Sequence, residues 1–522
     1  MKIQNILITL VLATQLVSAQ DVIWQHKTGG AHADFLYDAV PTLDYGFLLA
    51  GASLSQQQQG EGGGNYAYML TKYDEDGQEQ WTKFFGGNGI DHLKQIVPAY
   101  DGGYLLAGIS NSKESGNKTT GHIGQFDIWL IKLDMNGNEQ WQKTLGGLAN
   151  EHIGQIIRAK DGGFFIAGSS ASNEFVPSGN SLSSPDFIIK QGENFGGMDY
   201  WLVKLASDGN ALWQKSFGGK YNDVLKQIYE LPDGSLLLAG HSASPVSGNK
   251  SIAGDGHNDW WLIKTDASGK QLWQKSYGDN ADDKLFAMIG LKDGNILLGG
   301  NSTPITQKSK KNTADIVLIK INPDGDKIWE TTFDNNGDDF LTNILQNPDG
   351  TLILGAYTAA NAKLPVAGKG KDDFLLIKTQ ANGNELWRRS IGTRKKEVLQ
   401  KIIGTRDGGY VLVGSSIKHT AKGDSNSDFL IVKIADKDKP LQEKLPLEAI
   451  PNPALSYTKA VVGKDYDEGT MQVIDLNGKV LQTRKLQGER IIPVRMDAYP
   501  AGVYIIHIKT GKAQNSVKVL KE

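Results

Sequence analysis

Short hydrophobic segments of about five to seven residues alternate with turn residues along most of this chain, a pattern typical of antiparallel strands. Four such segments, called a to d here, recur as a unit. Segment a carries a tryptophan (141–146) and segment b follows an acidic residue (151–157). Segment c follows an aspartate-led turn (161–168), and segment d is the most apolar (127–132). The pattern predicts a chain of four-stranded meanders.

One tryptophan marks each copy of the unit, at intervals of about 60 residues, and such a fixed period indicates a repeat architecture. Seven of these units closing on themselves would leave only short, protected sheet edges. We therefore predict an all-β fold with a seven-bladed β-propeller over residues 20–434, and an open solenoid is the alternative. The marking tryptophans are Trp24, Trp81, Trp141, Trp213, Trp273, Trp329 and Trp387.

The turns between segments indicate how one blade is assembled. The turn between b and c begins with aspartate in every unit, and glycine follows it in all but the first, which supplies the positive φ of a tight turn. The turn between d and a is equally short, as at 136–137 and 208–209. A blade is therefore expected to run b-c-d-a, so that the first strand, around Trp24, completes the last blade and closes the ring.

Charged residues recur at two fixed places in the repeat. An acid lies ten residues before each b–c aspartate, and a lysine lies in each segment d. An active site needs one asymmetric constellation, so residues present in every copy are expected to cap turns and pair across strands. The tryptophans are likewise expected to be wedges between blades.

Composition and charge limit the classes of function. The net charge is −3 and the sequence pI is near 6.3, so nothing favours nucleic-acid binding. There is no cysteine, which excludes disulfides, thiol nucleophiles and cysteine-bound zinc. Residues 1–19 have a lysine, a short apolar run and a small-residue end, and they are predicted to be a cleaved signal peptide. No apolar stretch outside this segment is long enough to predict a transmembrane helix.

The repeat stops after Lys433, and residues 435–447 have the composition of a linker. The alternating pattern of residues 448–522 then predicts a small antiparallel, β-sandwich-like domain with an Asn-Gly turn at 477–478. Its distinctive positions are a Pro-Asn-Pro opening, a central Asp-x-x-Gly-Lys turn and a Gly-Val-Tyr strand, which comprise Pro451, Asn452, Pro453, Gly478, Gly502 and Tyr504.

These residues closely resemble the type A C-terminal sorting domain of the type IX secretion system. The resemblance implies recognition by that secretion machinery, passage through the outer membrane of a Bacteroidetes-type cell, and release or attachment at the surface, normally with removal of the sorting domain. The repeats resemble uncharacterised secreted propeller proteins that carry the same domain. That second resemblance brings no catalytic motif with it.

The alternation of strands divides the connections between two faces of the ring. The a–b and c–d connections lie on one face, called the loop face here, and the tight b–c and d–a turns lie on the other, the turn face. The c–d loops are long and differ between units, and the largest covers residues 169–198. Variable loops on a rigid scaffold are where binding and catalysis usually occur. The loop face is therefore the predicted functional face.

Two groups of residues on this face are candidates for a site. His241, His257 and Tyr221 come from neighbouring segments and would supply the base of a polysaccharide lyase if they converge. A basic sector would suit a sulfated or uronic glycan, although acidic a–b loops nearby make a balanced solvated surface the alternative. This sector includes Lys308, Lys310, Lys311, Arg394, Lys395 and Lys396, together with lysines of the c–d loops of units 6 and 7.

Together these observations predict an exported binding module for a carbohydrate or a protein. A polysaccharide lyase or glycoside hydrolase acting on the same face is the alternative. No cofactor or metal is predicted. The turn at 74–77 looks like part of a calcium loop, but it lacks the downstream bidentate glutamate and is better explained as a hairpin turn.

Overall fold

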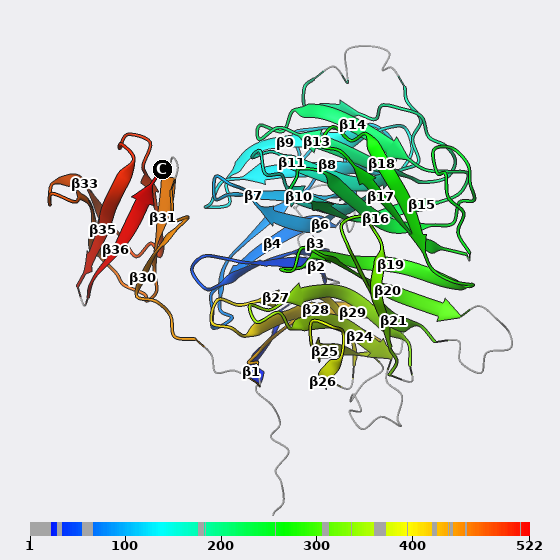
Figure 1. The fold of residues 1–522 in the computed structure, drawn as a ribbon. Coiled ribbons are helices and arrows are strands. Elements are labelled where there is room, and N and C mark those ends of the chain that lie inside the picture. Colours follow the sequence, from blue (N-terminus) through cyan, green and yellow to red (C-terminus); the bar gives the residue numbers. More distant parts are fainter. Residues whose placement is uncertain are drawn as a thin grey trace, which may run out of the picture.

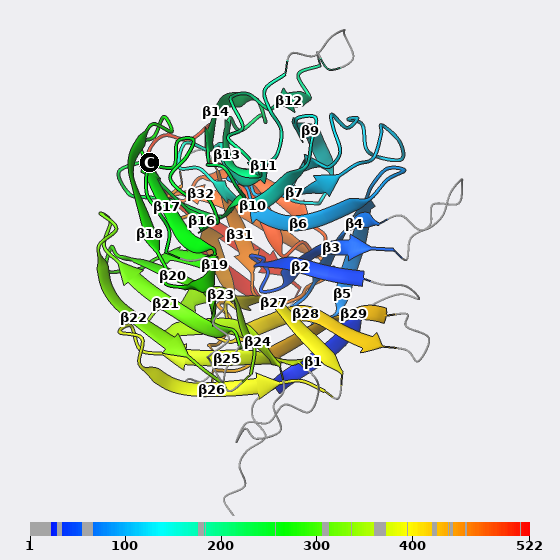
Figure 2. The same cartoon turned by 90° about the vertical axis from the view of Figure 1, so that its right-hand side faces the viewer.

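The computed structural model describes residues 22–28, 34–54, 66–175, 182, 184–255, 257–304, 313–335, 337–359, 372–393, 395–419, 425–436, 438, 442–454, 457–511 and 513–522. All the secondary-structure elements defined in this part of the chain are β-strands. Figure 1 shows the ring from its side, beside a smaller sandwich, and Figure 2 shows the sheets of the ring radiating from its centre. The all-β propeller followed by a small β domain is confirmed. The predicted signal peptide lies outside the described residues.

Four sheets of the ring are meanders in the predicted order b-c-d-a. They comprise β2 (Asp34–Pro41), β3 (Phe47–Ser53), β4 (Ala67–Tyr73) and β5 (Glu79–Phe85) in blade 1; β10 (Glu151–Arg158), β11 (Phe164–Ser170), β13 (Asp199–Leu205) and β14 (Ala211–Phe217) in blade 3; β15 (Asp223–Glu230), β16 (Leu236–Ser242), β17 (Asp259–Thr265) and β18 (Gln271–Tyr277) in blade 4; and β19 (Ala281–Gly290), β20 (Ile296–Pro304), β21 (Asp315–Ile321) and β22 (Lys327–Phe333) in blade 5.

Blade 2 has an additional strand. The short β12 (Phe187–Ile189), from the long loop 169–198, pairs in parallel with β9 at the outer edge. The long loop therefore extends the neighbouring blade and covers its edge. The other strands of this blade are β6 (Asp91–Pro98), β7 (Tyr104–Ser110), β8 (Asp127–Leu133) and β9 (Glu139–Gly146).

The remaining strands of the ring form one eight-stranded sheet. A single parallel bridge, Asp372 to Lys396, joins its two meanders, and dividing the sheet there gives blades 6 and 7. Strand β1 pairs antiparallel with β29, so the N-terminal strand completes the last blade as expected. The strands are β23 (Asp339–Gln346), β24 (Leu352–Ala359), β25 (Asp372–Thr379) and β26 (Glu385–Ile391), then β27 (Lys396–Gly404), β28 (Tyr410–His419), β29 (Ser425–Ile434) and β1 (Val22–Thr28).

The repeated tryptophans lie where one blade meets the next. A Cβ atom on Gly209, in the d–a turn of blade 3, would lie 3.0 Å from the ring of Trp141 in blade 2, and the equivalent glycine recurs around the ring. Trp24 of the last blade lies equally close to Gly77 of blade 1, and its indole donates to the Glu75 carbonyl at 3.2 Å. The predicted wedge role is confirmed, and Trp24 performs it across the closure.

The repeated lysines pair with the repeated turn aspartates. In five blades the buried lysine of segment d binds the b–c aspartate, which ties the turn to the middle of the sheet. The lysine of blade 6, Lys378, instead binds Asp436 just after the last strand, at 2.9 Å. The five pairs are Lys72–Asp44, Lys132–Asp101, Lys204–Asp161, Lys320–Asp293 and Lys433–Asp407.

The repeated acid at the start of segment b organises the a–b loop. Asp91 accepts hydrogen bonds from the Gly87 amide and the Ser112 hydroxyl, both at 2.8 Å. Glu151 makes the same kind of contact with Gly147 and with Ser172 in blade 3. The equivalent acids of blades 4 to 7 also accept a backbone amide of the a–b loop. These repeated carboxyl groups are therefore part of the scaffold, as predicted for residues that occur in every copy.

The C-terminal domain is a sandwich of two sheets around one apolar core. The core includes Met471, Val494 and Ile506, all fully buried. No helix among the residues described here is long and apolar enough to cross a membrane. One sheet contains β30 (Leu447–Ile450), β31 (Tyr457–Val462) and β34 (Ile491–Arg495), and the other contains β33 (Val480–Leu486), β32 (Gly469–Asp475), β35 (Gly502–Thr510) and β36 (Gln514–Lys521).

Candidate functional site

The innermost strand of each blade faces a central channel. These b strands line a cavity of about 260 Å³ whose walls include Tyr37, Lys94, Gln155, Phe286 and Lys401, one from each of five blades. Each b strand begins at the loop face, directly after the a–b connection. Side chains near the start of the strand therefore lie at the loop-face end of the channel, called the channel mouth here.

Side-chain hydrogen bonds tie neighbouring b strands together around the channel. The residue four positions after the repeated acid reaches the backbone of the next blade in most units. Asp38 also receives the Lys401 ammonium of the last blade at 3.1 Å, which closes the ring. The backbone bonds join Asp38 to Ile96 (3.1 Å), Gln95 to Ile156 (2.5 Å), Gln155 to Ile228 (2.8 Å), Gln227 to Phe286 (3.0 Å) and Asn343 to Ile402 (2.9 Å).

Two half-buried lysines at the channel mouth have no counter-ion among the described residues. The Lys94 ammonium lies 3.5 Å from the centroid of the Tyr37 ring, and the Lys226 ammonium lies 5.9 Å from that of Phe286. Neither makes an ion pair within the described part of the chain. Burial, together with the charge of Lys226, lowers the pKa of Lys94 to about 8. Burial and the charge of Lys284 lower the pKa of Lys226.

Aromatic and imidazole rings surround Lys94. The Tyr37 hydroxyl lies 3.3 Å from Nδ1 of His92, and the rings of His92 and Tyr66 have centroids 4.7 Å apart. Burial and the charge of Lys94 lower the pKa of His92 to about 4, and burial raises the pKa of Tyr37 to about 12. Both side chains are therefore neutral at pH 7.

His241 belongs to the same cationic region. It is 7% exposed, and its Nδ1 atom has no hydrogen-bond partner among the described residues. Burial, followed by the charges of Lys226 and Lys284, lowers its pKa to about 3. The Lys284 ammonium, in contrast, is paired with Asp282 at 2.7 Å. The channel mouth thus combines neutral imidazoles with unpaired positive charge.

The other residues of the predicted His/Tyr group lie elsewhere. His257 is exposed, and Tyr221 is 51% exposed beside Lys220 on the a–b loop of blade 4. No hydrogen bond, ion pair or ring contact links either of them to His241 within the described ranges. Of the three, His241 is the one that the structure places among the groups of the channel mouth.

The predicted basic sector is largely beyond what the structure describes. Lys308, Lys310, Lys311 and Arg394 lie outside the described residues. The Lys395 amide donates to the Thr393 hydroxyl at 3.2 Å, and Lys396 is paired with Asp372 at 2.7 Å. The charge of Lys396 is therefore already neutralised by the protein.

One group of acids has a spacing compatible with a metal ion. Asp315, Asp334 and Asp339 each place a carboxylate oxygen within 4.8 Å of the others. In blades 2 and 4 burial raises the pKa of the equivalent acids, Asp91 and Asp223, and the charges of the buried Lys118 and Lys250 oppose this rise. The corresponding loop of blade 5 lies outside the described residues. We assign no metal here.

The sorting-motif positions have structural roles in the C-terminal domain. The Asn452 amide donates to the Lys518 carbonyl at 2.7 Å and accepts from the Leu520 amide at 2.9 Å, which ties the motif to β36. Gly478 has a φ of 83°, as its turn requires, and the buried Tyr504 donates to the Pro500 carbonyl. Gly502 begins β35, and Pro451 and Pro453 flank Asn452 in the exposed opening.

The comparison with known families decides what this second domain is. Residues 448–522 match the model of the secretion system C-terminal sorting domain. The C-terminal domain is a secretion sorting domain. The protein is therefore secreted or displayed at the cell surface, and the sorting domain implies an interaction with the secretion machinery.

Relatives of the propeller are distant. The chain is 24% identical over 232 residues to an uncharacterized WD repeat-containing protein of Acanthamoeba polyphaga mimivirus (38% of this chain, 16% of that protein). It is 24% identical over 207 residues to the regulatory protein FlaEY of Caulobacter vibrioides (38% and 21%). The chain thus spans less than a quarter of either protein. Among solved structures it is similar to an ulvan lyase, a polysaccharide lyase, with 8% identity, a TM-score of 0.45, and coverage of 77% and 95%.

The sequence carries two signals for the channel. In six units the position four residues after the repeated acid is polar or charged. These residues are Asp38, Gln95, Gln155, Gln227, Asn343 and Lys401. The position before it carries Lys94 in one unit and Lys226 in another. Across the copies, these two positions therefore form a polar ring and hold two isolated cations. Their convergence depends on closure of the propeller.

Proposed function

We propose that this protein is an exported binding module that takes an acidic carbohydrate at the channel mouth on its loop face. The observation that carries the proposal is the pair Lys94 and Lys226, two half-buried ammonium groups with no carboxylate partner among the residues that the structure describes. A buried charge is costly unless it is paired. A uronate or sulfate group would supply the missing counter-ion.

The surroundings of these lysines support a sugar ligand. Binding sites generally combine apolar or aromatic walls with a few well-placed polar groups. Tyr37, Tyr66 and Phe286 supply rings at the mouth, and neutral His92 and His241 supply hydrogen-bonding nitrogens. A positive potential focused in a channel also favours the approach of an anionic polymer.

A polysaccharide-degrading enzyme is the alternative, and one contact favours it. The Tyr37 hydroxyl and His92 lie together beside Lys94, so a base and a cation that could neutralise a uronate are adjacent. An efficient general base, however, has a pKa near the working pH. The pKa of about 4 for His92 and about 12 for Tyr37 leave both far from it. Binding without turnover is therefore the preferred function.

Affinity measurements on the secreted full-length chain would test this proposal. We expect binding to a uronate-bearing polysaccharide but not to a neutral one. The double variant Lys94→Met/Lys226→Met should weaken binding by about tenfold or more, since each lost charge contact is worth on the order of 1 kcal/mol. The matched control Lys215→Met/Lys270→Met removes the same charge from exposed positions and should bind normally.

The same samples would distinguish the alternatives. Release of unsaturated or reducing ends that disappears in Tyr37→Phe would establish an enzyme. Equal affinity of the channel variant and the wild type would show that the site lies elsewhere. If neither the uronate-bearing nor the neutral polysaccharide binds, a protein partner is the remaining ligand for the loop face.

A further inference from the structure

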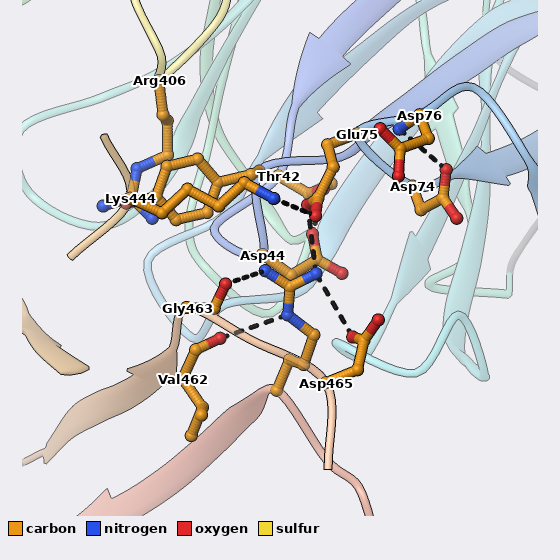
Figure 3. A network of polar contacts seen from close by, with 12 residues as sticks. Thr42, Asp44, Asp74, Glu75, Asp76, Arg406, Lys444, Val462, Gly463 and Asp465 are labelled. Atoms are coloured by element: carbon orange, nitrogen blue, oxygen red, sulfur yellow. Dashed lines mark hydrogen bonds and ion pairs between the residues drawn. The ribbon is translucent and has the colours of Figure 1, made fainter. Parts of the chain in front are cut away.

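The sorting domain contacts the propeller on its turn face, opposite the loop face. The contacts come from turns of blades 1 and 7 on one side and from residues 444–490 on the other. Figure 3 shows the part of this network around Glu75 and Lys444. Two propeller residues at the centre of this network, Tyr45 and Glu75, depart from the repeat. A residue that differs from its equivalents in the other blades points to a role specific to its own blade.

Tyr45 occupies a position that is glycine in every other blade. It is the one non-glycine residue with a positive φ, 69°, in the described part of the chain. This region of φ is unfavourable for a residue with a side chain, so an observed exception suggests a role for that side chain. The other blades have Gly102, Gly162, Gly234, Gly294, Gly350 and Gly408 at this position, all with positive φ.

The side chain of Tyr45 contacts the sorting domain, the segment that leads to it and Arg406 of blade 7. Its hydroxyl donates to the Glu448 carboxylate at 3.0 Å and accepts from the Leu445 amide at 3.3 Å. The Arg406 guanidinium lies 4.4 Å from the Tyr45 ring and pairs with Glu448 at 2.6 Å. Tyr45 is left only 7% exposed.

Glu75 is the second departure. It lies in the d–a turn of blade 1 and receives Nη1 of Arg490 at 3.0 Å and the ammonium of Lys444. Arg490 is held by the carbonyls of Val462 and Gly463, at 3.1 Å and 3.2 Å, so its orientation is fixed within the sorting domain. The equivalent turn residues of the other blades carry no charge: Met135, Ser207, Ala267, Pro323 and Ala381.

We propose that Tyr45 and Glu75 form a built docking site for the sorting domain, and that docking holds residues 442–446 against the propeller and so protects this connection from proteolytic cutting. In the docked state Lys444 is tied through its ammonium to Glu75 and Leu445 through its amide to Tyr45. The Pro446 carbonyl accepts from the Gly463 amide at 3.1 Å. Cutting needs a segment that can leave its contacts, so separation of the two domains has to wait for undocking.

Docking also determines which face is free. Because the sorting domain occupies the turn face, the loop face stays open in the uncut chain. This inference does not depend on what the loop face binds.

Limited proteolysis of the full-length chain with a lysine-specific protease would test it. The measured quantity is the rate at which a fragment beginning at Leu445 appears, followed by mass spectrometry. Glu75→Arg places a third positive charge against Arg490 and Lys444, and it should accelerate this cut by about tenfold because cutting follows the population of the open form. The control Ala267→Arg introduces the same residue at the exposed, equivalent turn of blade 4 and should leave the rate unchanged.

A second variant separates docking from damage to the propeller. Tyr45→Gly restores the residue found in the other blades, so thermal unfolding of the propeller should occur at the same or a higher temperature. The cut after Lys444 should nevertheless become several-fold faster. Rates equal to that of the wild type in both Glu75→Arg and Tyr45→Gly would overturn the proposal, whatever either variant does to unfolding.

Discussion

Lys401 in the last blade and Asp38 in the first form an ion pair of 3.1 Å that closes the ring of contacts around the channel. Asp38 is 3% exposed, and its second oxygen accepts the Ile96 amide at 3.1 Å, so one carboxylate joins three blades. The pair complements the outer closure, in which β1 completes the sheet of blade 7. The ring is therefore fastened at its inner and its outer edge.

Removing this carboxylate should destabilise the propeller. We expect Asp38→Ala to lower the free energy of unfolding by about 3 kcal/mol, because it leaves the Lys401 charge and a buried amide unpaired. Asp38→Asn, which keeps an acceptor for the amide, should cost less. The measurement is equilibrium unfolding in urea. Lys327→Met, which breaks an exposed pair with Glu330, serves as the control and should change stability by less than about 1 kcal/mol.

Asp436 and Asp101, which pair with the repeated lysine in two different blades, should contribute differently to stability. Asp436 is buried against Lys378 and also accepts from the Tyr410 hydroxyl, whereas the side chain of Asp101, the partner of Lys132, is 50% exposed. We expect Asp436→Ala to cost about 2 kcal/mol, because it removes the buried partner of Lys378 and leaves only the half-exposed Asp438, 2.9 Å from the same ammonium. We expect Asp101→Ala to cost about 1 kcal/mol or less, because water reaches that pair. Parallel urea titrations would measure both. Equal costs would show that burial of the partner is irrelevant here.

Buried carboxyl groups should make stability depend on pH. Burial first, and then the nearby Asp223, raise the pKa of Asp199 to about 7 despite the opposing charge of Lys190. A carboxyl whose pKa is higher in the folded than in the unfolded protein stabilises most below its unfolded pKa, and this stabilisation is lost as pH rises to about 7. Asp199→Asn removes the effect, so the stability of this variant relative to wild type should rise between pH 4 and pH 7 and then level off. Urea midpoints across this range would show it.

The control for this prediction is Asp208→Asn, a change in an exposed turn of the same blade. Its difference from wild type should be constant over the same pH range. Buried His92 and His241 act in the opposite direction at acidic pH, because their folded pKa is lowered. Comparing each variant with wild type at every pH cancels their contribution.

Binding at the channel mouth should weaken in alkaline solution. The pKa of Lys94 is lowered to about 8, so its ammonium is largely neutral at pH 9 and cannot pair with an anion. We therefore expect the affinity for an acidic polysaccharide to fall between pH 7 and pH 9 at constant ionic strength, measured by calorimetry. In Lys94→Arg the charge persists, so its affinity should change much less. An unchanged wild-type affinity at pH 9 would remove Lys94 from the site.

Local pattern was sufficient for much of the architecture. The recurrence of Trp141 and its equivalents, the aspartate-glycine turns and the alternation of short apolar segments predicted four-stranded meanders, because strand and turn formation depend on residues close in sequence. The order b-c-d-a and the closing role of the strand at Trp24 followed from the shortness of the d–a turn. The sorting domain was evident from its motifs, since these are contiguous.

The sites depended on contacts that no local pattern specifies. Lys94 and Lys226 come from different blades, and closure of the ring places both at the channel mouth and half-buries them. His241 became part of that region, whereas His257 and Tyr221 stayed at the exposed edge, because burial depends on how neighbouring blades pack. Tyr45 was visible in the sequence as an exception to a glycine turn, but its meaning required the sorting domain to be folded and docked against it. Sequence alone determined the repeating unit and the export domain. The tertiary structure decided which charged side chains are shielded from solvent and where the sorting domain contacts the propeller.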